Sequence, residues 1–180
     1  MRLFFNFFGF QVGWFACVYG AANTRPLLGP LVVLIIVTIH LAISKNTYKE
    51  LILLTVVGLI GLFWDSLLMI FGLVTYPSGV IFNGLAPYWV VSMWVLYATT
   101  LNVCLHWLRK RYFLSIFLGA LLGPLAYFIG EKLGGINILN HRYSLFFIGV
   151  GWAMILPMLN VVSKRLDGAI FAENATFLND

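Results

Sequence analysis

The sequence predicts an all-α membrane protein, a bundle of six transmembrane helices with both termini in the cytoplasm. Of its 180 residues, 62% are hydrophobic and only 9% are charged. A soluble domain is about 45–50% apolar and about 25% charged. Six apolar runs are also long enough to cross about 30 Å of hydrocarbon at about 1.5 Å per residue. The basic residues lie in short clusters between these runs, as membrane orientation signals do.

The predicted spans follow one another along the chain, separated by short connections that contain turn-forming residues. They cover residues 4–22, 27–43, 51–73, 87–107, 113–130 and 144–162. The second and fifth lie near the short limit for a transmembrane helix. We expect one domain, residues 1–162, and a short cytoplasmic tail, residues 163–180, that is too small to form a second domain.

The connection Val74–Ala86 differs from the others because it is uncharged and contains two turn signals, Ser78-Gly79 and Asn83-Gly84. It is typical of a loop at the membrane interface. The alternative is a re-entrant segment, which requires that protein cover its backbone.

The basic residues predict the orientation. Eight lie on the N-terminal side of the spans: Arg2, Lys45, Lys49, Arg109, Lys110, Arg111, Lys164 and Arg165. Three lie on the other side: Arg25, Lys132 and Arg142. An excess of Lys and Arg marks the cytoplasmic side. The formal charge of +5 therefore reflects orientation, and since no soluble basic face with stacking aromatics exists, nucleic acid is not an expected partner.

Asp65, in the third span, is the strongest chemical signal. A charged carboxylate in the bilayer costs about 2.5–3.5 kcal/mol on insertion scales, so it should face protein, water or a partner. Gly58, Gly61 and Gly72 fall on the same helical face, and small residues allow helices to approach closely. Asp65 is therefore either functional, as a proton carrier, counter-charge or acid/base, or structural, tying helices together by hydrogen bonds.

Other polar and aromatic residues predict a site around Asp65. Ser92, Thr99, Asn102 and His106 share one face of the fourth predicted helix, as the wall of a cavity open to the cytoplasm or as interhelical hydrogen-bonding groups. Three tryptophans lie at comparable depth, away from the interfaces. The expected ligand-binding residues are Asp65, Trp64, Trp94, Asn102, His106, Tyr127 and Trp152.

Close helix packing is predicted at four glycines, since small residues mark the contacts between transmembrane helices. These are Gly58, Gly61, Gly119 and Gly123.

Several chemistries are excluded. The three histidines lie on different segments, two toward the cytoplasm and one outside, so no metal site is expected. No phosphate loop, dinucleotide fingerprint or nucleophile elbow occurs. Cys17 and Cys104 both fall in apolar runs, where Cys behaves as a small apolar residue. We therefore expect no metal and no cofactor.

The order of several motifs resembles that of a family of small bacterial inner-membrane proteins known only as a domain of unknown function. The motifs are Asn6–Pro26 (NFFGFQVGWFACVYGAANTRP), Asp65–Leu68, Pro87-x-Trp89, Trp94–Leu101 and Gly123–Gly134. The resemblance covers nearly the whole chain and implies the bacterial inner membrane, but no reaction. Members are similar to proteins encoded beside cyclopropane-fatty-acid-synthase-like and amine-oxidase-like genes, which implies a link to membrane lipid modification or oxidative stress.

Three functions remain open. The favoured one is not enzymatic: binding or transport of a small or amphiphilic, lipid-like ligand in a pocket near Asp65. The second is an intramembrane lipid-modifying enzyme that uses Asp65 with His106 or Tyr127. The third is a non-catalytic partner of enzymes of lipid modification or oxidative stress. An enzyme requires reactive groups converging on one atom, a carrier requires a pocket, and a scaffold requires a filled interior with a hydrogen-bonded Asp65.

Overall fold

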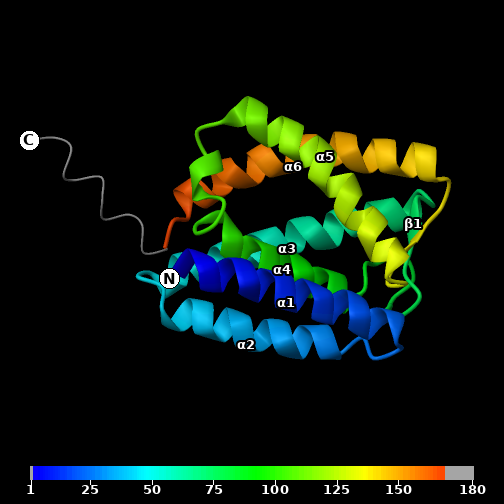
Figure 1. The fold of residues 1–180 in the computed structure, drawn as a ribbon, viewed down its shortest axis with the longest axis horizontal. Coiled ribbons are helices and arrows are strands. Elements are labelled where there is room, and N and C mark those ends of the chain that lie inside the picture. Colours follow the sequence, from blue (N-terminus) through cyan, green and yellow to red (C-terminus); the bar gives the residue numbers. More distant parts are fainter. Residues whose placement is uncertain (1, 169–180) are drawn as a thin grey trace, which may run out of the picture.

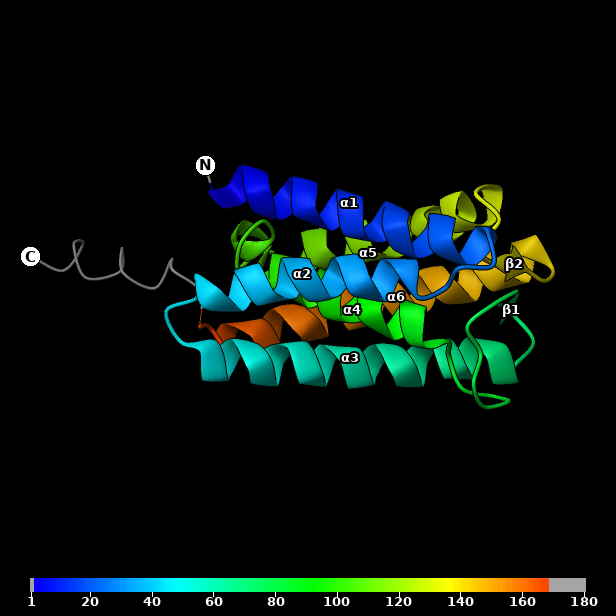
Figure 2. The ribbon, with the colours of Figure 1, turned by 90° about the horizontal axis from the view of Figure 1, so that it is seen from below.

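The computed structural model describes residues 2–168, which form six α-helices lying along one long axis (Figures 1 and 2). The helices are α1 (Arg2–Ala22), α2 (Leu28–Ala42), α3 (Thr47–Ile70), α4 (Tyr88–Leu101), α5 (Tyr112–Lys132) and α6 (His141–Arg165). A short 3₁₀ helix, η1 (His106–Leu108), follows α4, and the strands β1 (Val74–Thr75) and β2 (Asn137–Ile138) pair antiparallel. The end of the bundle where α1 begins is called the N-terminal end below, and the opposite one the β end.

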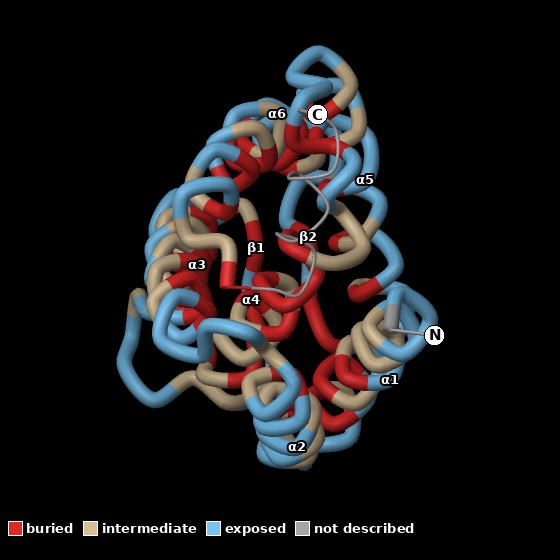
Figure 3. Tube along the Cα trace, turned by 90° about the vertical axis from the view of Figure 1, so that its left-hand side faces the viewer, coloured by how far each residue is buried: buried red, intermediate tan, exposed pale blue. Residues whose placement is uncertain are grey.

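Four of these helices, α1, α3, α5 and α6, are long and apolar enough to cross a membrane. Their outward faces carry large apolar side chains, such as Phe113, which is 90% exposed. The buried residues face the middle of the bundle (Figure 3). A soluble monomer does not expose apolar surface on this scale, so the chain is a membrane-embedded helical protein, as predicted.

The helices α2 and α4 are shorter than the predicted spans, with 15 and 14 residues, or about 21–22 Å at about 1.5 Å per residue. The predicted C-terminal boundary of the fourth span, residue 107, was wrong, because α4 ends at Leu101 and Asn102 caps it. The side chain of Asn102 turns away to donate to Glu50, at 2.6 Å. His106 lies beyond in η1, so neither residue continues the predicted polar face of α4.

The predicted start of the third span and the predicted end of the sixth differ from the observed helix ends by a few residues. Helix α3 begins earlier than expected because the side chain of Asn46 caps it, accepting from the backbone N–H of Lys49 at 3.1 Å. Helix α6 extends to Arg165 and so includes the start of the predicted tail. The rest of that tail, residues 169–180, lies outside the described residues.

The connection between α3 and α4 folds over the β end of the bundle. Val74 is fully buried and pairs with Ile138 in the short ribbon. Ser78 donates its hydroxyl to the carbonyl of Ala21 at 2.8 Å, which ties the loop to the end of α1. No helix re-enters the bundle between residues 74 and 86. The segment has no helix of its own, and its depth in the membrane stays a prediction.

Three tryptophans each lie against a glycine of a neighbouring helix. A Cβ added at Gly61 of α3 would lie 1.9 Å from the Trp94 ring of α4, so no side chain fits there. The other two pairs are Gly123 of α5 with Trp152 of α6, and Gly151 of α6 with Trp64 of α3. Because glycine has no side chain, each of these three positions leaves the space that the indole occupies.

The predicted glycine contacts are confirmed at four positions. Besides Gly61 and Gly123, an added Cβ at Gly119 would lie 2.2 Å from the Trp152 carbonyl oxygen, and one at Gly58 would lie 3.0 Å from Val95. The assignment of Gly72 to the packed face of α3 was wrong. Gly72 follows the helix at a positive φ of 63° and has nothing within 4 Å of the added atom. Its role is to turn the chain.

These contacts predict that Gly61→Ala destabilises the bundle by about 1–3 kcal/mol, the usual effect of overpacking. Gly9→Ala is the matched control, because Gly9 is also helical and its added Cβ would make an ordinary contact of 3.5 Å with Ile36. We expect Gly9→Ala to leave stability unchanged or raise it slightly, since Ala favours the helix. Thermal unfolding in detergent measures both variants. Equal melting temperatures for the two would contradict the packing argument.

Candidate functional site

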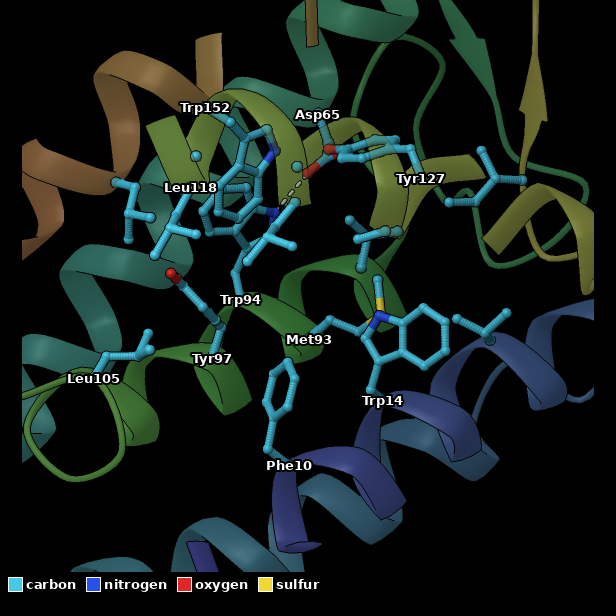
Figure 4. Close-up of a pocket in the computed structure, with 18 of the residues that line it drawn as sticks. Phe10, Trp14, Asp65, Met93, Trp94, Tyr97, Leu105, Leu118, Tyr127 and Trp152 are labelled. Carbon is cyan, nitrogen blue, oxygen red and sulfur yellow. Dashed lines mark hydrogen bonds between the residues drawn. The ribbon is translucent and has the colours of Figure 1, made fainter. Parts of the chain in front are cut away.

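A cavity of about 280 Å³ lies inside the bundle between α1, α4, α5 and α6 (Figure 4). Its volume lies just below the range of about 300–1,000 Å³ that is usual for small-molecule sites. Its walls are mainly aromatic and aliphatic, while Asp65 and Tyr76 bring polar groups to one part of it. The aromatic wall residues are Phe10, Trp14, Trp94, Tyr97, Tyr127 and Trp152.

Asp65 is only 1% exposed, and its carboxyl group accepts three hydrogen bonds. The hydroxyl groups of Tyr76 and Tyr127 donate to Oδ1 at 2.5 and 2.6 Å. The indole N–H of Trp94 donates to Oδ2 at 2.6 Å (Figure 4). These donors come from α4, α5 and the loop after α3, so one carboxyl group joins three parts of the chain. They replace the water that a carboxyl loses when it enters the bilayer.

Tyr76 was not among the predicted site residues. It lies 11 residues after Asp65 in the loop that folds back over the bundle, and its ring packs edge-to-face on Trp89 at 5.6 Å. Burial, together with the adjacent Asp65, raises the pKa of the Tyr76 hydroxyl well above its ordinary value, so it remains a donor. The signal that could have identified Tyr76 was the uncharged loop that directly follows the span containing Asp65.

The tryptophans form the wall next to the carboxyl group. Trp94 and Trp152 stack with ring centroids 4.9 Å apart and an interplanar angle of 13°. Tyr97 meets Trp152 edge-to-face at 5.6 Å. Such pairs stabilise a fold beyond their buried area. The indole N–H groups of Trp64 and Trp152 are buried and lie near the Tyr127 hydroxyl, without the geometry of a regular hydrogen bond.

The structure brings together four of the seven predicted site residues: Asp65, Trp94, Tyr127 and Trp152 line one cavity. Trp64 instead packs against Gly151. Asn102 and His106 lie at the N-terminal end and are not part of the cavity wall. No polar path therefore leads from Asp65 through these two residues. The apolar Leu105 and Leu108 line that end of the cavity.

A second buried polar cluster closes the N-terminal end. The carboxyl group of Glu50 is fully buried and contacts Nε2 of His40 at 2.9 Å and Nδ2 of Asn102 at 2.6 Å. Arg109 donates to Oδ1 of Asn102 and pairs with Asp167 at 2.7 Å. The cluster thus ties α2, α3, the end of α4 and the segment after α6 to one another.

The sequence did not predict this second cluster, because its charged residues Glu50 and Arg109 were assigned to connections between the predicted spans. A usable signal existed: His40 and Glu50 flank the short turn between α2 and α3, and a tight turn brings such flanking residues together. His106 lies next to the cluster, and its pKa is lowered by partial burial and by the charge of Arg109. An imidazole with a lowered pKa is neutral at pH 7.

One wall of the cavity, on α5, is partly exposed at the outer surface. Leu122 of α5 lines the cavity and is also 49% exposed. Helix α1, which supplies Phe10 and Trp14 to the opposite wall, packs on α2 and α4 and only weakly on α5. The exposed part of this wall therefore belongs to the apolar surface of the bundle. The arrangement suits an apolar molecule with one polar group, because the walls are apolar and Asp65 lies in one part of them. No cluster of three metal-ligating side chains occurs in residues 2–168.

Comparison with known proteins finds one family. The model of the family described as Protein of unknown function (DUF2878) matches residues 3–158. No curated protein and no solved structure shows significant similarity to the chain. The proposed function therefore rests on the geometry of the cavity.

The hydrogen bonds to Asp65 predict how its variants behave. Asp65→Leu leaves three buried donors without an acceptor, at about 1–3 kcal/mol each, and should lower stability strongly. Asp65→Asn keeps one amide oxygen for the two tyrosines and should lower it less. Thermal unfolding of both variants in detergent measures the difference. A Leu variant as stable as the parent would show that the hydrogen bonds contribute nothing to the fold.

Proposed function

The chain belongs to the DUF2878 family, since the family model covers nearly all of it, and from its interior we propose that it binds a small or amphiphilic ligand beside Asp65. The observation that carries the proposal is the cavity itself. Its walls are apolar and aromatic, and it ends on a buried carboxyl group. An apolar pocket with a few convergent polar groups is the usual form of a small-molecule site.

We propose an opening between α1 and α5, through which the ligand enters from the bilayer. Leu122 lies at this opening, and the neighbouring outward side chains of α5, such as Leu121 and Phe117, are exposed and apolar. A molecule dissolved in lipid would reach Asp65 without crossing water. Leu105, Leu108 and the Glu50 cluster close the N-terminal end, so transport across the membrane would need that end to open.

For the membrane arrangement we propose six spans with both termini in the cytoplasm of a bacterium, in its inner membrane. The start of α1, the α2–α3 connection, the start of α5 and the end of α6 lie at the same end of the bundle (Figure 1). That end carries the eight basic residues of the more basic side, and basic loops face the cytoplasm. The short α2 and α4 cross with the help of flanking loops that protein covers.

An intramembrane lipid-modifying enzyme is the second candidate. Its supporting observation is the contact of 2.6 Å between the Tyr127 hydroxyl and Asp65, because a carboxyl and a phenol in contact can exchange a proton with a bound molecule. His106, the other partner considered from the sequence, lies at the N-terminal end.

The third candidate, a non-catalytic partner of lipid-modification or oxidative-stress enzymes, requires no open interior. The cavity therefore favours ligand binding over it.

Ligand binding is tested with n-decanol and n-decylamine on the purified protein, with native mass spectrometry to count bound molecules. We expect binding to the parent and a loss of binding in Leu122→Trp, because the larger ring fills the opening. Leu121→Trp is the matched control, since Leu121 is exposed to a similar extent but does not line the cavity. Failure of both probes to bind the parent, or equal binding by the two variants, would overturn the proposal.

The arrangement is tested by labelling single cysteines with a membrane-impermeant maleimide in a background that lacks Cys17 and Cys104. We expect cysteines at Lys45 and Lys110 to react only in inside-out vesicles, and one at Lys132 to react in intact spheroplasts. The reason is the excess of basic residues at the first two connections. Labelling of all three from the same side would contradict the six-span arrangement.

A further inference from the structure

We propose that the ligand carries a protonated amine, which binds the carboxylate of Asp65 while its apolar body fills the cavity. The inference rests on the proposed function and deepens it by naming the chemical class of the ligand. It follows from three features of the site: the acceptor that Asp65 leaves unused, the absence of a cation beside it, and the aromatic walls.

Asp65 is surrounded by hydrogen-bond donors. All three of its hydrogen bonds come from groups that donate to it, those of Tyr76, Tyr127 and Trp94. A carboxylate has about four acceptor positions. Two tyrosines occupy Oδ1 and one indole occupies Oδ2, so Oδ2 retains one position for a further donor.

No positively charged side chain within residues 2–168 pairs with Asp65. Three ion pairs, those of His40 with Glu50, Arg109 with Asp167 and His141 with Glu131, lie toward the ends of the bundle. A cation beside a carboxylate inside a membrane protein stabilises its charge. Because the protein supplies donors and no cation, a bound cation completes the site.

The walls next to Asp65 are suited to a cation. The stacked rings of Trp94 and Trp152 line the cavity, and a cation within about 6 Å of an aromatic centroid is attracted to the ring face. The hydroxyl oxygen of Tyr76 keeps a lone pair while it donates. With Oδ2 of Asp65 it offers acceptors for the N–H groups of a primary ammonium.

A simple amphiphilic amine fits better than the headgroup of an aminophospholipid. The phosphate of such a headgroup would enter with the amine, and the cavity wall contains no basic side chain to receive it. Asp65 would also repel it. The ligand class is therefore an amine attached directly to an apolar body.

The test compares dissociation constants of three probes with one chain length at pH 7: n-decylamine, n-decanol and n-decyltrimethylammonium. The amine is protonated at this pH. We expect the amine to bind the parent at least about tenfold more tightly than the alcohol, the effect of one charge-assisted hydrogen bond. The trimethylammonium probe, which keeps the charge and has no N–H donor, should bind between them.

Variants locate the preference. Asp65→Asn should remove the advantage of the amine over the alcohol, and Asp167→Asn, the matched control at the N-terminal end, should keep it. If Asp65→Asn does not fold, Tyr76→Phe serves instead, because it keeps the carboxyl group and removes one acceptor of the amine. Its amine preference should fall and its alcohol binding should persist.

The outcomes separate this inference from the proposed function. Equal binding of amine and alcohol to the parent would overturn the amine assignment and leave a neutral ligand in the same cavity. An amine preference that survives in Asp65→Asn would also overturn it. Failure of every probe to bind would overturn the proposed function itself. Displacement of n-decylamine by phosphatidylethanolamine and not by phosphatidylcholine would assign the site to a lipid headgroup.

Discussion

A carboxyl group inside a membrane protein must find hydrogen-bond donors in the protein, and the arrangement around Asp65 follows from this requirement. Its three donors belong to α4, α5 and the loop after α3. To reach one carboxyl group, these parts of the chain must meet at one point. In a bilayer the hydrophobic effect does not draw helices together, so buried hydrogen bonds and close packing set their positions. The carboxyl group is therefore part of the fold as well as of the cavity.

Glycines make this meeting possible. The indole that donates to Asp65 lies directly on Gly61, and the indole stacked on it lies on Gly123. A methyl group at either position would push the ring away from its place. Each glycine is thus paired with one indole. The glycine has no side chain, and the indole of the neighbouring helix fills the space that this leaves. The stacked indole rings form one wall of the cavity, and the space between this wall and α1 stays unfilled.

Helix α3 connects the two buried polar clusters of the molecule. One face of this helix carries Glu50 near its start and Asp65 toward its end, with Gly58 and Gly61 between them, and all four are buried. Glu50 holds the N-terminal end through α2 and the end of α4, while Asp65 holds the β end. The cavity lies beside this helix, closed by apolar residues toward Glu50 and by hydrogen-bonded groups toward Tyr76. The polar groups therefore stay at the two ends, and the space between them is apolar.

The sequence alone determined the all-helical membrane fold, the approximate helices, the inward direction of Asp65 and the glycine contacts. These follow from composition, hydropathy and the 3.6-residue period, which act along one segment at a time. Only the tertiary structure decided that Tyr76 reaches Asp65, that Asn102 leaves its helix for Glu50, and that a cavity lies between α1, α4, α5 and α6. Each of these depends on contacts between segments distant in the chain, and a hydropathy pattern contains no information about which segments meet.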